Sequence, residues 1–476
     1  MFTSPHLICV TERIRLNGKP VSKEEFTNGF WIVFNKLQSR HDQIAAEGKG
    51  MSFGGLDLPS HPPYFRFLTL LAIYIFKNHN FAENTQDDIS GSGVTDTMLL
   101  EVGIGGRYDA TNLFTSAKAT CVTTLDYDHC RTLGYKLSEI AFEKGGIMKP
   151  NVAAFTSPQE TSALEKLGEC ADDVDTTLVT IDNEYDLINP LWKLGLQGDF
   201  QKMNAALAVA MSMVACGDKK SDEVLANKGI YDEEIRQALG DSRWPGRCQT
   251  IEYVGDEEYG DCTFCIDGAH TTKSMNLSTS WFYEEYIKSG FNQENIIGGG
   301  GSGSGDGGGG GDFDGVLTKK RKLEKEAKKK KRKVLLFNCS HERNPIELLK
   351  IAIDSKIEFD VAIFCAALSE RPSAIKKSSA LELMKEENVV SVKLGEDEIL
   401  SEENTWQDTL AILWRNLSSN STHDIYSFPG ITKAIEFIKS EDSVVLCCGS
   451  LYLVGSLLEG LNWSEEEAKG SLKTDK

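Results

Sequence analysis

Short apolar runs alternate with helix-like segments along this chain, and this alternation limits the folds that the chain can adopt. In the first half, the strand-like runs are residues 98–102, 119–123, 152–155 and 178–181, and the helix-like segments are residues 137–144 and 200–214. Strands that alternate with helices form parallel sheets with helices on both faces. The pattern therefore predicts an α/β fold.

The alternation resumes after residue 241. The later strand-like runs are residues 264–267, 334–339, 361–366 and 444–448, and the later helix-like segments are residues 345–353, 431–439 and 450–461. A Trp244-Pro-Gly-Arg247 turn stands just before this second series. A chain of 476 residues suits two to three domains at ~150 residues each. We therefore predict two α/β domains, residues 1–241 and residues 242–476.

An unusual segment interrupts the second domain. Residues 298–311 contain 11 glycines among 14 positions, and residues 319–333 carry 11 basic and two acidic residues. The glycine-rich part cannot offset its ordering entropy, so we expect a disordered insertion over residues 298–333. Its basic part has two interpretations, a nuclear localisation or RNA-binding patch and a solvated, weakly helical stretch. We favour the solvated stretch, since such patterns are permissive.

The overall charge and hydropathy exclude several classes of protein. The formal net charge is −20, which argues against binding of the whole protein to nucleic acid or to an anionic membrane. The longest apolar runs, residues 67–76 and 205–216, are too short to span a bilayer. We expect a soluble protein whose clefts can still take an anionic substrate.

The twelve cysteines do not form the pattern of a disulfide framework. Cys447 and Cys448 are neighbours in an apolar strand-like run, where successive side chains point to opposite faces. Cys262 and Cys265 have CxxC spacing but lack a second pair or a histidine partner, which argues against a zinc site. Buried thiols in a reducing compartment are the better interpretation.

Acidic side chains follow two strand-like runs of the first half. Glu101 opens the turn Glu101-Val-Gly-Ile-Gly-Gly106, and Asp128 and His129 follow the run 119–123. Ligands collect at the carboxyl ends of strands in open α/β sheets. The glycines could approach a phosphate or simply allow a tight turn, and His129 could be an ordinary loop residue. Two acidic strand ends in one sheet make a shared Mg²⁺ site more plausible than either strand end would by itself.

Lys144 ends the helix-like segment 137–144 and is followed by Gly145 and Gly146, which resemble a C-cap. The simple interpretation is that Lys144 complements the helix dipole. The alternative is a buried lysine whose neutral amine reacts with CO₂ to give a carbamate that ligates a metal. Residue chemistry alone does not favour the carbamate.

The second half repeats the pattern of a strand followed by an acidic turn. In Asp267-Gly-Ala-His270, the carboxylate could accept hydrogen bonds from a ribose and the imidazole could contact an anion, although Asp-Gly is also an ordinary turn. Arg247 carries a planar guanidinium that suits a phosphate or a carboxylate.

Taken together, these motifs resemble the folylpolyglutamate synthases of the Mur ligase superfamily. The matching motifs run in the family's order: Thr3-Ser-Pro-His-Leu7, Glu12-Arg-Ile-Arg15, Leu100-Glu-Val-Gly-Ile-Gly-Gly106, Asp109-Ala-Thr-Asn112, Asp128-His129, Leu133-Gly134, Ile140-Ala-Phe-Glu-Lys144-Gly-Gly-Ile147, Gln201-Lys-Met-Asn-Ala-Ala206, Trp244-Pro-Gly-Arg247, Asp267-Gly-Ala-His270 and Gly449-Ser-Leu-Tyr-Leu-Val-Gly455. The resemblance spans residues 3 to 455. It implies a P-loop-type central domain with a mixed or parallel sheet, followed by a Rossmann-like C-terminal domain.

The resemblance also implies a reaction. ATP would phosphorylate the γ-carboxylate of a tetrahydrofolate or of its polyglutamates, and the amino group of L-glutamate would then attack the acyl phosphate. Two Mg²⁺ ions would offset the charge on the phosphate oxygens. The first domain would hold ATP and the folate, and the second would bring the glutamate.

The same resemblance assigns roles to individual residues. Ser4, Glu101 and His129 would ligate magnesium, and Lys144 would be the carbamylated lysine. Asn204 would contact adenine, Arg247 the phosphates and Asp267 the ribose, while His270 would lie near the phosphates or the incoming glutamate. The loop Ser4-Pro5-His6 would help to hold the folate.

The start of the sequence departs from the family. Family members have a strand, a Gly-Thr-x-Gly-Lys-Gly-Ser/Thr phosphate loop and a helix upstream of the motif at Thr3, so we expect a βα unit of roughly 30 residues to be missing here. The tripeptide Gly48-Lys49-Gly50 follows a helix-like stretch rather than a strand and does not replace the loop.

Three functional readings follow from that departure. We favour an active ligase whose sequence continues upstream. The alternatives are a short, non-catalytic product that binds folate or regulates, and a bifunctional enzyme that also joins dihydropteroate to glutamate. We further expect a monomer that binds neither membrane nor nucleic acid, and a cytoplasmic location with a mitochondrial form as the alternative.

Overall fold

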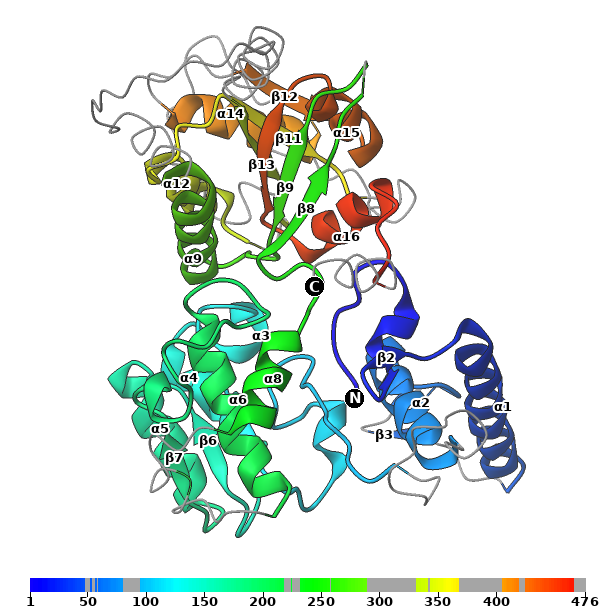
Figure 1. The fold of residues 1–476 in the computed structure, drawn as a ribbon. Coiled ribbons are helices and arrows are strands. Elements are labelled where there is room, and N and C mark those ends of the chain that lie inside the picture. The colour runs from blue at the N-terminus through cyan, green and yellow to red at the C-terminus, as the bar shows by residue number, and fades with distance from the viewer. Residues whose placement is uncertain are drawn as a thin grey trace, which may run out of the picture. The chain divides into compact units, whose positions relative to one another are not determined.

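The structure is a computed structural model that describes residues 1–47, 52–53, 56–57, 59–79, 95–217, 224, 232–256, 258–288, 331–340, 343–367, 405–418 and 424–465. The chain divides into two compact units, one formed by Met1–Trp192 with Lys202–Arg236 and the other by Lys193–Gln201 with Gln237–Lys476 (Figure 1). Each unit has its own hydrophobic core. Residues 298–330 of the predicted insertion lie outside the described residues.

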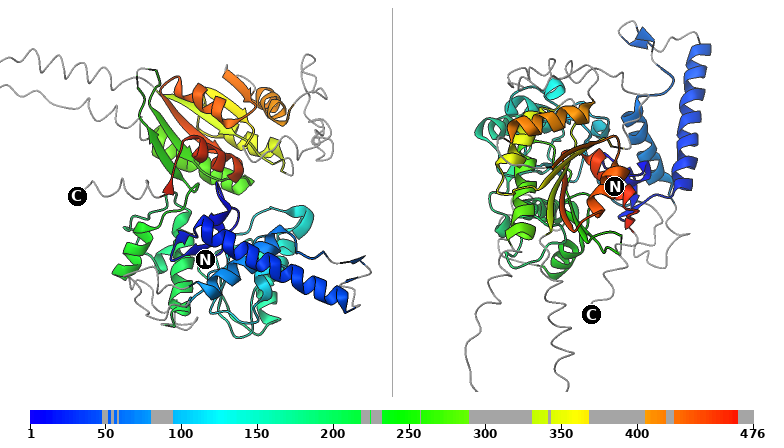
Figure 2. Two further views of the ribbon diagram at one scale, coloured as in Figure 1. Left: turned by 90° about the vertical axis from the view of Figure 1, so that its right-hand side faces the viewer. Right: turned by 90° about the horizontal axis from the view of Figure 1, so that it is seen from above.

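The first unit begins with small strand pairs and two packed helices. Its strands are β1 (Arg15–Leu16), β2 (Lys19–Pro20), β3 (Ser52–Phe53) and β4 (Leu56–Asp57), paired β1 with β2 and β3 with β4. Helix α1 (Lys23–Ala46) begins where the Ser22 hydroxyl accepts a hydrogen bond from the Glu25 amide at 3.0 Å. Helix α2 (Tyr64–Asn78) lies beside α1 (Figure 2) and buries Leu71 and Ile75.

The predicted strand at residues 98–102 does not form as such. Leu100 makes one isolated parallel bridge to Phe2, with the Phe2 amide donating to Leu99 O at 2.9 Å and the Glu101 amide donating to Phe2 O at 2.9 Å. The pairing ends there because the next amide that could continue it, that of Ser4, donates at 2.8 Å to the Glu101 side chain instead of to the Glu101 carbonyl. Even so, the single bridge places Glu101 beside the loop that follows Phe2.

The rest of the first unit is a parallel sheet with covering helices. Strands β5 (Thr120–Val122), β6 (Ala154–Thr156) and β7 (Leu178–Thr180) lie in the order β5-β6-β7 and are all parallel. The helices here are α3 (Cys130–Leu133), α4 (Leu137–Gly145), α5 (Thr161–Asp172) and α6 (Gln201–Ala215), and α8 (Glu233–Asp241) spans the division between the units. Parallel pairing places the loops that follow these strands at one edge of the sheet.

The second unit is a six-stranded sheet in the order β12-β11-β10-β13-β9-β8, in which only β8 is antiparallel to its neighbour. The strands are β8 (Gln249–Tyr253), β9 (Cys262–Ile266), β10 (Arg332–Phe337), β11 (Val361–Cys365), β12 (Asp424–Phe428) and β13 (Ser443–Cys448). Helices α9 (Thr272–Phe282), α12 (Pro345–Asp354) and α14 (Trp406–Leu417) cover one face, and α15 (Ile431–Lys439) and α16 (Leu451–Gly460) cover the other (Figure 1). This is the doubly wound, Rossmann-like arrangement that the sequence predicts.

The strands of this sheet send alternate side chains to its two faces. Cys448 belongs to the core under α9, α12 and α14, and its fully buried neighbour Cys447 does not. None of the twelve cysteines, all of which lie in described ranges, forms a disulfide. The predicted opposite orientation of Cys447 and Cys448 is confirmed.

Strand β10 begins inside the segment that we assigned to the insertion, so the predicted end of the insertion at residue 333 is wrong. Arg332 pairs with Ser443 and its guanidinium lies 5.1 Å from the centre of the Phe437 ring. The same guanidinium donates to the carbonyls of Phe437 at 3.2 Å and Ile438 at 3.3 Å. These contacts provide partners for the Arg332 guanidinium at the start of a buried strand. The basic composition of the segment gave no sign of this strand start.

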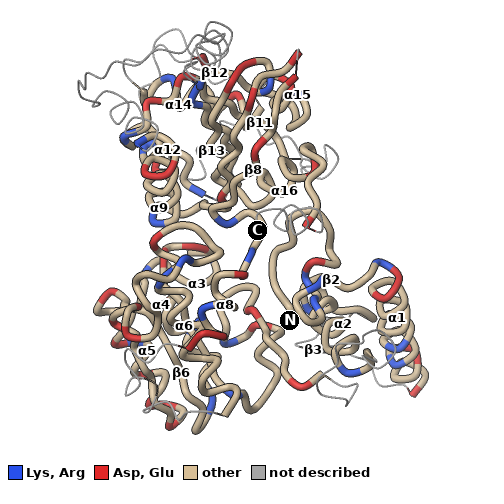
Figure 3. Tube along the Cα trace, in the orientation of Figure 1, with Lys and Arg blue, Asp and Glu red and all other residues tan. Residues whose placement is uncertain are grey.

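Charged residues of both signs are interspersed along the helices of each unit (Figure 3). Among the described residues, no helix is both long and apolar enough to cross a membrane.

Candidate active site

The loop that follows Phe2 is organised by the carboxylate of Glu12. One oxygen of Glu12 accepts the amide of Leu7 at 2.9 Å, and the other accepts the amides of Ile8 at 3.0 Å and Cys9 at 2.6 Å. Three hydrogen bonds to one carboxylate hold this loop in a single conformation. The predicted folate-binding residues Ser4, Pro5 and His6 therefore come just before a rigid turn.

Arg13 determines the state of His6. The Arg13 Nε donates to His6 Nδ1 at 2.9 Å, and the guanidinium lies 5.6 Å from the centre of the Tyr64 ring. Burial and the charge of Arg13 lower the pKa of His6, against a smaller opposing effect of Glu12. A guanidinium can only donate, so Nδ1 accepts and the neutral imidazole carries its proton on Nε2. His6 can thus offer a hydrogen-bond donor to a ligand.

The structure brings Ser4 and Glu101 together across 97 residues of sequence. The Ser4 amide donates to Glu101 Oε2 at 2.8 Å. Glu101 is exposed and Ser4 is half-buried, so both are accessible. A hydroxyl and a carboxylate are the oxygen ligands that Mg²⁺ prefers, and these two residues therefore fit a magnesium site by their chemistry.

The glycines after Glu101 serve close packing. A Cβ on Gly103 would lie 2.5 Å from the ring of Phe65, and Gly105 has φ = +68°. Asp109 then closes the turn by accepting the amides of Ile104 at 3.2 Å and Thr111 at 2.9 Å. Of the two interpretations that the sequence left open, a tight turn is the one that these contacts support.

His129 and Lys144 each interact with Asp128. His129 has φ = +53°, and its Nε2 lies 3.7 Å from Asp128 Oδ2. Lys144 is half-buried; burial lowers its pKa, whereas the charge of Asp128 acts in the opposite direction. A lowered pKa raises the fraction of neutral amine, which is the form that reacts with CO₂.

A glycine caps the C-terminus of α4, as predicted, but without a left-handed turn. Gly145 is the last helical residue, and Gly146 has right-handed angles, φ = −63° and ψ = −3°. A Cβ on Gly146 would lie 2.5 Å from the Arg107 side chain, and a Cβ on Gly145 would lie 2.9 Å from Cys170. Glycine is therefore needed for close packing here and not for a left-handed turn.

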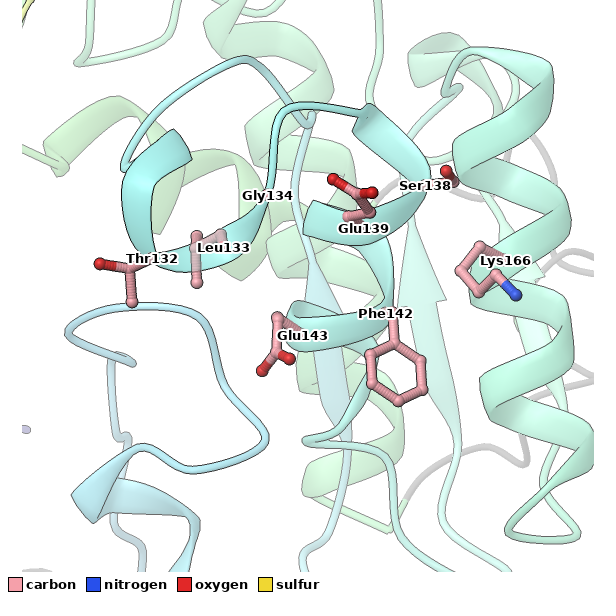
Figure 4. Close-up of a pocket in the computed structure, with 8 residues that line it drawn as sticks. All are labelled: Thr132, Leu133, Gly134, Ser138, Glu139, Phe142, Glu143 and Lys166. Atoms are coloured by element: carbon pink, nitrogen blue, oxygen red, sulfur yellow. The ribbon is translucent and has the colours of Figure 1, made fainter.

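A pocket of about 440 Å³ lies beside this helix (Figure 4). It is lined by Thr132, Leu133, Gly134, Ser138, Glu139, Phe142, Glu143 and Lys166. The Glu139 carboxylate already accepts the amides of Tyr135 and Lys136. None of the predicted site residues lines this pocket, although its wall residue Glu143 directly precedes Lys144.

The predicted magnesium set is not assembled as a cluster. Within the described part of the chain, no group of three or more His, Cys, Asp and Glu side chains is placed to hold a metal ion. Ser4 and Glu101 are in contact, and His129 and Lys144 each interact with Asp128. Asn204 is exposed on α6 of the same unit.

In the second unit, Asp267 binds together the turns that follow β9 and precede β8. Its Oδ1 accepts the amide of Ala269 at 2.9 Å, and its Oδ2 accepts the amide of Cys248 at 2.9 Å. Burial raises the pKa of Asp267, opposed by the nearby Arg247 guanidinium and by these hydrogen bonds. The buried carboxylate therefore has a structural role in the turn that the sequence did not reveal.

His270 and Arg247 flank this turn. His270 Nδ1 lies 2.5 Å from Gly268 O, and the Arg343 guanidinium donates to His270 O at 3.1 Å. A Cβ on Gly268 would lie 2.3 Å from Arg247 Nη1, so glycine lets the guanidinium approach the backbone. Arg343 thus belongs with Arg247 and His270, although the sequence analysis did not select it. Its position as a basic residue shortly after strand β10 is the sequence signal that could have found it.

The two α/β units with their parallel sheets match the two-domain fold of the Mur ligases. Two solved structures share this fold. Folylpolyglutamate synthase of Mycobacterium tuberculosis, complexed with ADP and AMPPCP, superposes with a TM-score of 0.60 and 18% identity, over 96% of this chain and 83% of that one. The Thermotoga maritima enzyme gives a TM-score of 0.58 and 19% identity, over 97% of this chain and 81% of that one.

The sequence relatives identify the family, although no family model matches the chain. Folylpolyglutamate synthases of Saccharomyces cerevisiae strains FostersO and AWRI796 are each 30% identical over 475 residues, covering 96% of this chain and 70% of the relative. The chain belongs to the folylpolyglutamate synthase family, whose members are ATP-dependent ligases.

Proposed function

We propose that this protein adds L-glutamate to the γ-carboxyl of tetrahydrofolate and its polyglutamates at the expense of ATP. The observation that carries the proposal is the 30% identity to yeast folylpolyglutamate synthases across 96% of the chain. The amide bond forms in two steps. The γ-carboxylate first attacks the γ-phosphorus of ATP and releases ADP, and the glutamate amine then displaces phosphate from the acyl phosphate.

In the first unit, Ser4, Glu101 and His129 are the proposed ligands of two Mg²⁺ ions. The contact between Ser4 and Glu101 supports their assignment to one ion, and the interaction of both His129 and Lys144 with Asp128 suits a second. Bound Mg²⁺ would neutralise charge on the phosphate oxygens. Lys144, with its lowered pKa, would react with CO₂ and add carbamate oxygens next to His129.

The loop of Ser4, Pro5 and His6 is the proposed folate contact. Glu12 fixes the turn directly after this loop and Arg13 holds the His6 side chain, so less conformational freedom is lost when a ligand binds. His6 would donate from Nε2 to an acceptor on the folate. Asn204, exposed on α6, is the proposed adenine contact.

In the second unit, Arg247 would contact the phosphates, Asp267 the ribose and His270 the phosphates or the glutamate. The support is that Asp267 and His270 follow β9, where α/β sheets bind ligands, and that Arg247, in the turn before β8, lies against Gly268 of the same turn. The two oxygens of Asp267 already accept backbone amides, so a ribose hydroxyl would share them. We also propose a cytoplasmic monomer, with a mitochondrial form as the alternative.

The function is tested by ADP release from the full chain supplied with ATP, Mg²⁺, tetrahydrofolate and glutamate. We expect ADP release that depends on both organic substrates and a product heavier by one glutamyl residue. Glu101→Gln is expected to lower the rate by about 100-fold or more, because a metal ligand is lost. The matched control is Glu165→Gln, exposed on α5.

Two results would count against parts of this proposal. A wild-type chain without glutamate-dependent turnover would contradict the function. An active wild-type chain whose Glu101→Gln variant keeps its full rate would contradict the metal assignment alone.

A further inference from the structure

Asn112 uses every hydrogen-bonding group of its side chain in the first unit. Its Nδ2 donates to Arg107 O at 3.1 Å and to Gly146 O at 3.0 Å, and its Oδ1 accepts from Lys149 Nζ at 2.7 Å. A lysine ammonium donates and a carbonyl accepts, so these partners fix which end of the amide carries the oxygen. The side chain is half-buried and has one arrangement that satisfies all three contacts.

The two carbonyls that Asn112 joins come from segments 39 residues apart, at 107 and 146. Arg107 directly follows the glycine turn that begins at Glu101, and Gly146 directly follows the helix that carries Lys144. Asn112 is therefore a clamp between the segment of a proposed metal ligand and the segment of the proposed carbamate lysine.

Further contacts bring the same two segments together. The Arg107 amide donates to Glu143 O at 2.8 Å, and its guanidinium donates to Phe142 O at 3.2 Å. The guanidinium also stacks on the Phe142 ring, 3.9 Å from its centre. A Cβ on Gly106 would lie 3.0 Å from the carbonyls of Glu143 and Lys144, so the backbones touch.

We propose that Asn112 is a positioning residue that sets the end of α4, and with it Lys144, relative to the Glu101 turn. The inference rests on the proposed function, in which Lys144 and Glu101 act on the same reaction. A displacement of about 1 Å between catalytic groups can lower a rate by roughly 100-fold, so the loss of a clamp at this place should lower kcat.

Asparagine is the side chain that this place requires. Aspartate has the same shape but offers no donor, and it would turn a negative charge toward two carbonyl oxygens. Leucine would leave both carbonyls and the Lys149 ammonium without their partner. Asn112→Asp therefore removes the clamp with the least change in volume.

The experiment compares the wild-type chain with Asn112→Asp, Asn112→Ala, Lys149→Met and the control Thr156→Val. The control removes the hydrogen bonds of Thr156 Oγ1 with Val122 O at 2.8 Å and with Gln159 Nε2 at 3.0 Å, in the same unit and with partners outside both segments. Two properties are measured: kcat and KM for the ligase reaction, and the ¹³C NMR signal of a carbamate on Lys144 after exposure to ¹³C-bicarbonate. The carbamate signal is read without turnover.

We expect Asn112→Asp to lower kcat by about 100-fold with KM values within about threefold of the wild type. The carbamate signal should fall with it, and Lys149→Met should lower kcat by about tenfold. Thr156→Val should lower the thermal midpoint while leaving kcat and the carbamate signal unchanged.

Several outcomes overturn the proposal. An active wild type whose Asn112→Asp variant keeps both its kcat and its carbamate signal contradicts the positioning role while the proposed function stands. A parallel loss of kcat in Thr156→Val means that general stability, and not position, is measured. If Asn112→Asp does not fold, Asn112→Ala decides, because it removes both carbonyl contacts without adding a charge, and an unchanged kcat in that variant rejects the clamp. A wild type without turnover rejects the proposed function itself.

Discussion

The carboxylate of Glu12 accepts three backbone amides, from Leu7, Ile8 and Cys9, and the adjacent Arg13 donates to His6. Two neighbouring residues of opposite charge thus organise one loop in different ways. Glu12 fixes the backbone, and Arg13 fixes the protonation of a side chain that can face a ligand. The charged side chains of Glu12 and Arg13 therefore set the conformation of this loop before any substrate is bound.

The lowered pKa of His6 makes a prediction about pH. Burial and Arg13 hold this pKa below 6.5, so between that lowered value and pH 6.5 the unfolded chain binds more protons than the folded one. The stability of the folded state must then fall as the pH drops through 6.5. In His6→Gln this contribution is absent. We expect the wild type to lose stability relative to His6→Gln between about pH 7.5 and about pH 5.5.

The measurement is urea denaturation of both proteins at the two pH values. All other titrating groups are shared, so their effects cancel in the difference. A difference in unfolding free energy that does not change with pH would show that His6 is not held neutral by Arg13.

At the scale of elements, the parallel strands and their helices follow from apolar runs and turn residues close in sequence. Helix α15 has the bounds predicted from the sequence, residues 431–439, and strand β13 begins one residue early at Ser443. The edge strands β8 and β12 were not predicted, because their side chains are only partly buried and carry no continuous apolar run. The predicted start of an element is wrong where a charged residue finds its partner in a distant part of the sequence, as Arg332 does with the carbonyls of Phe437 and Ile438.

Arg332 gives the prediction at this scale. Its guanidinium donates to two carbonyls at the end of α15 and stacks on Phe437, and its side chain is 13% exposed. We expect Arg332→Ala to lower the stability of the second unit by about 1.5–3 kcal/mol, the usual effect of losing a hydrogen bond to a charged group. The neighbouring Lys333→Ala should cost less than about 1 kcal/mol.

Hydrogen exchange of the β10 and β13 amides in the full chain is the measurement. Equal loss of protection in the two variants would mean that Arg332 belongs, like the rest of the basic run, to the solvated segment.

At the scale of the molecule, the chain has separate cores in its two units. Phe364 is fully buried in the second unit, 6.3 Å from Phe337 and 6.2 Å from Trp414 between ring centres. Ile140 is fully buried in the first unit under the β5–β7 sheet. Each residue packs with neighbours of its own unit, so damage to one core should stay local.

We expect Phe364→Ala to lower the stability of the second unit by about 3–5 kcal/mol and Ile140→Ala that of the first by about 2–5 kcal/mol. Hydrogen exchange with mass spectrometry, on the full chain, should show faster exchange in the unit that carries the substitution. Faster exchange of both units in both variants would mean that the two cores unfold together.

The sequence by itself determined the α/β class, the family and the residues at the strand ends, because strand runs, helix periods and motifs are local properties of the chain. The tertiary structure decided what those residues touch. It placed the Ser4 amide on Glu101 across 97 residues, gave Asp267 two backbone amides, and made Asn112 the link between two distant turns. Hydrogen bonds and desolvation depend on partners that folding alone brings together, and no local pattern encodes them.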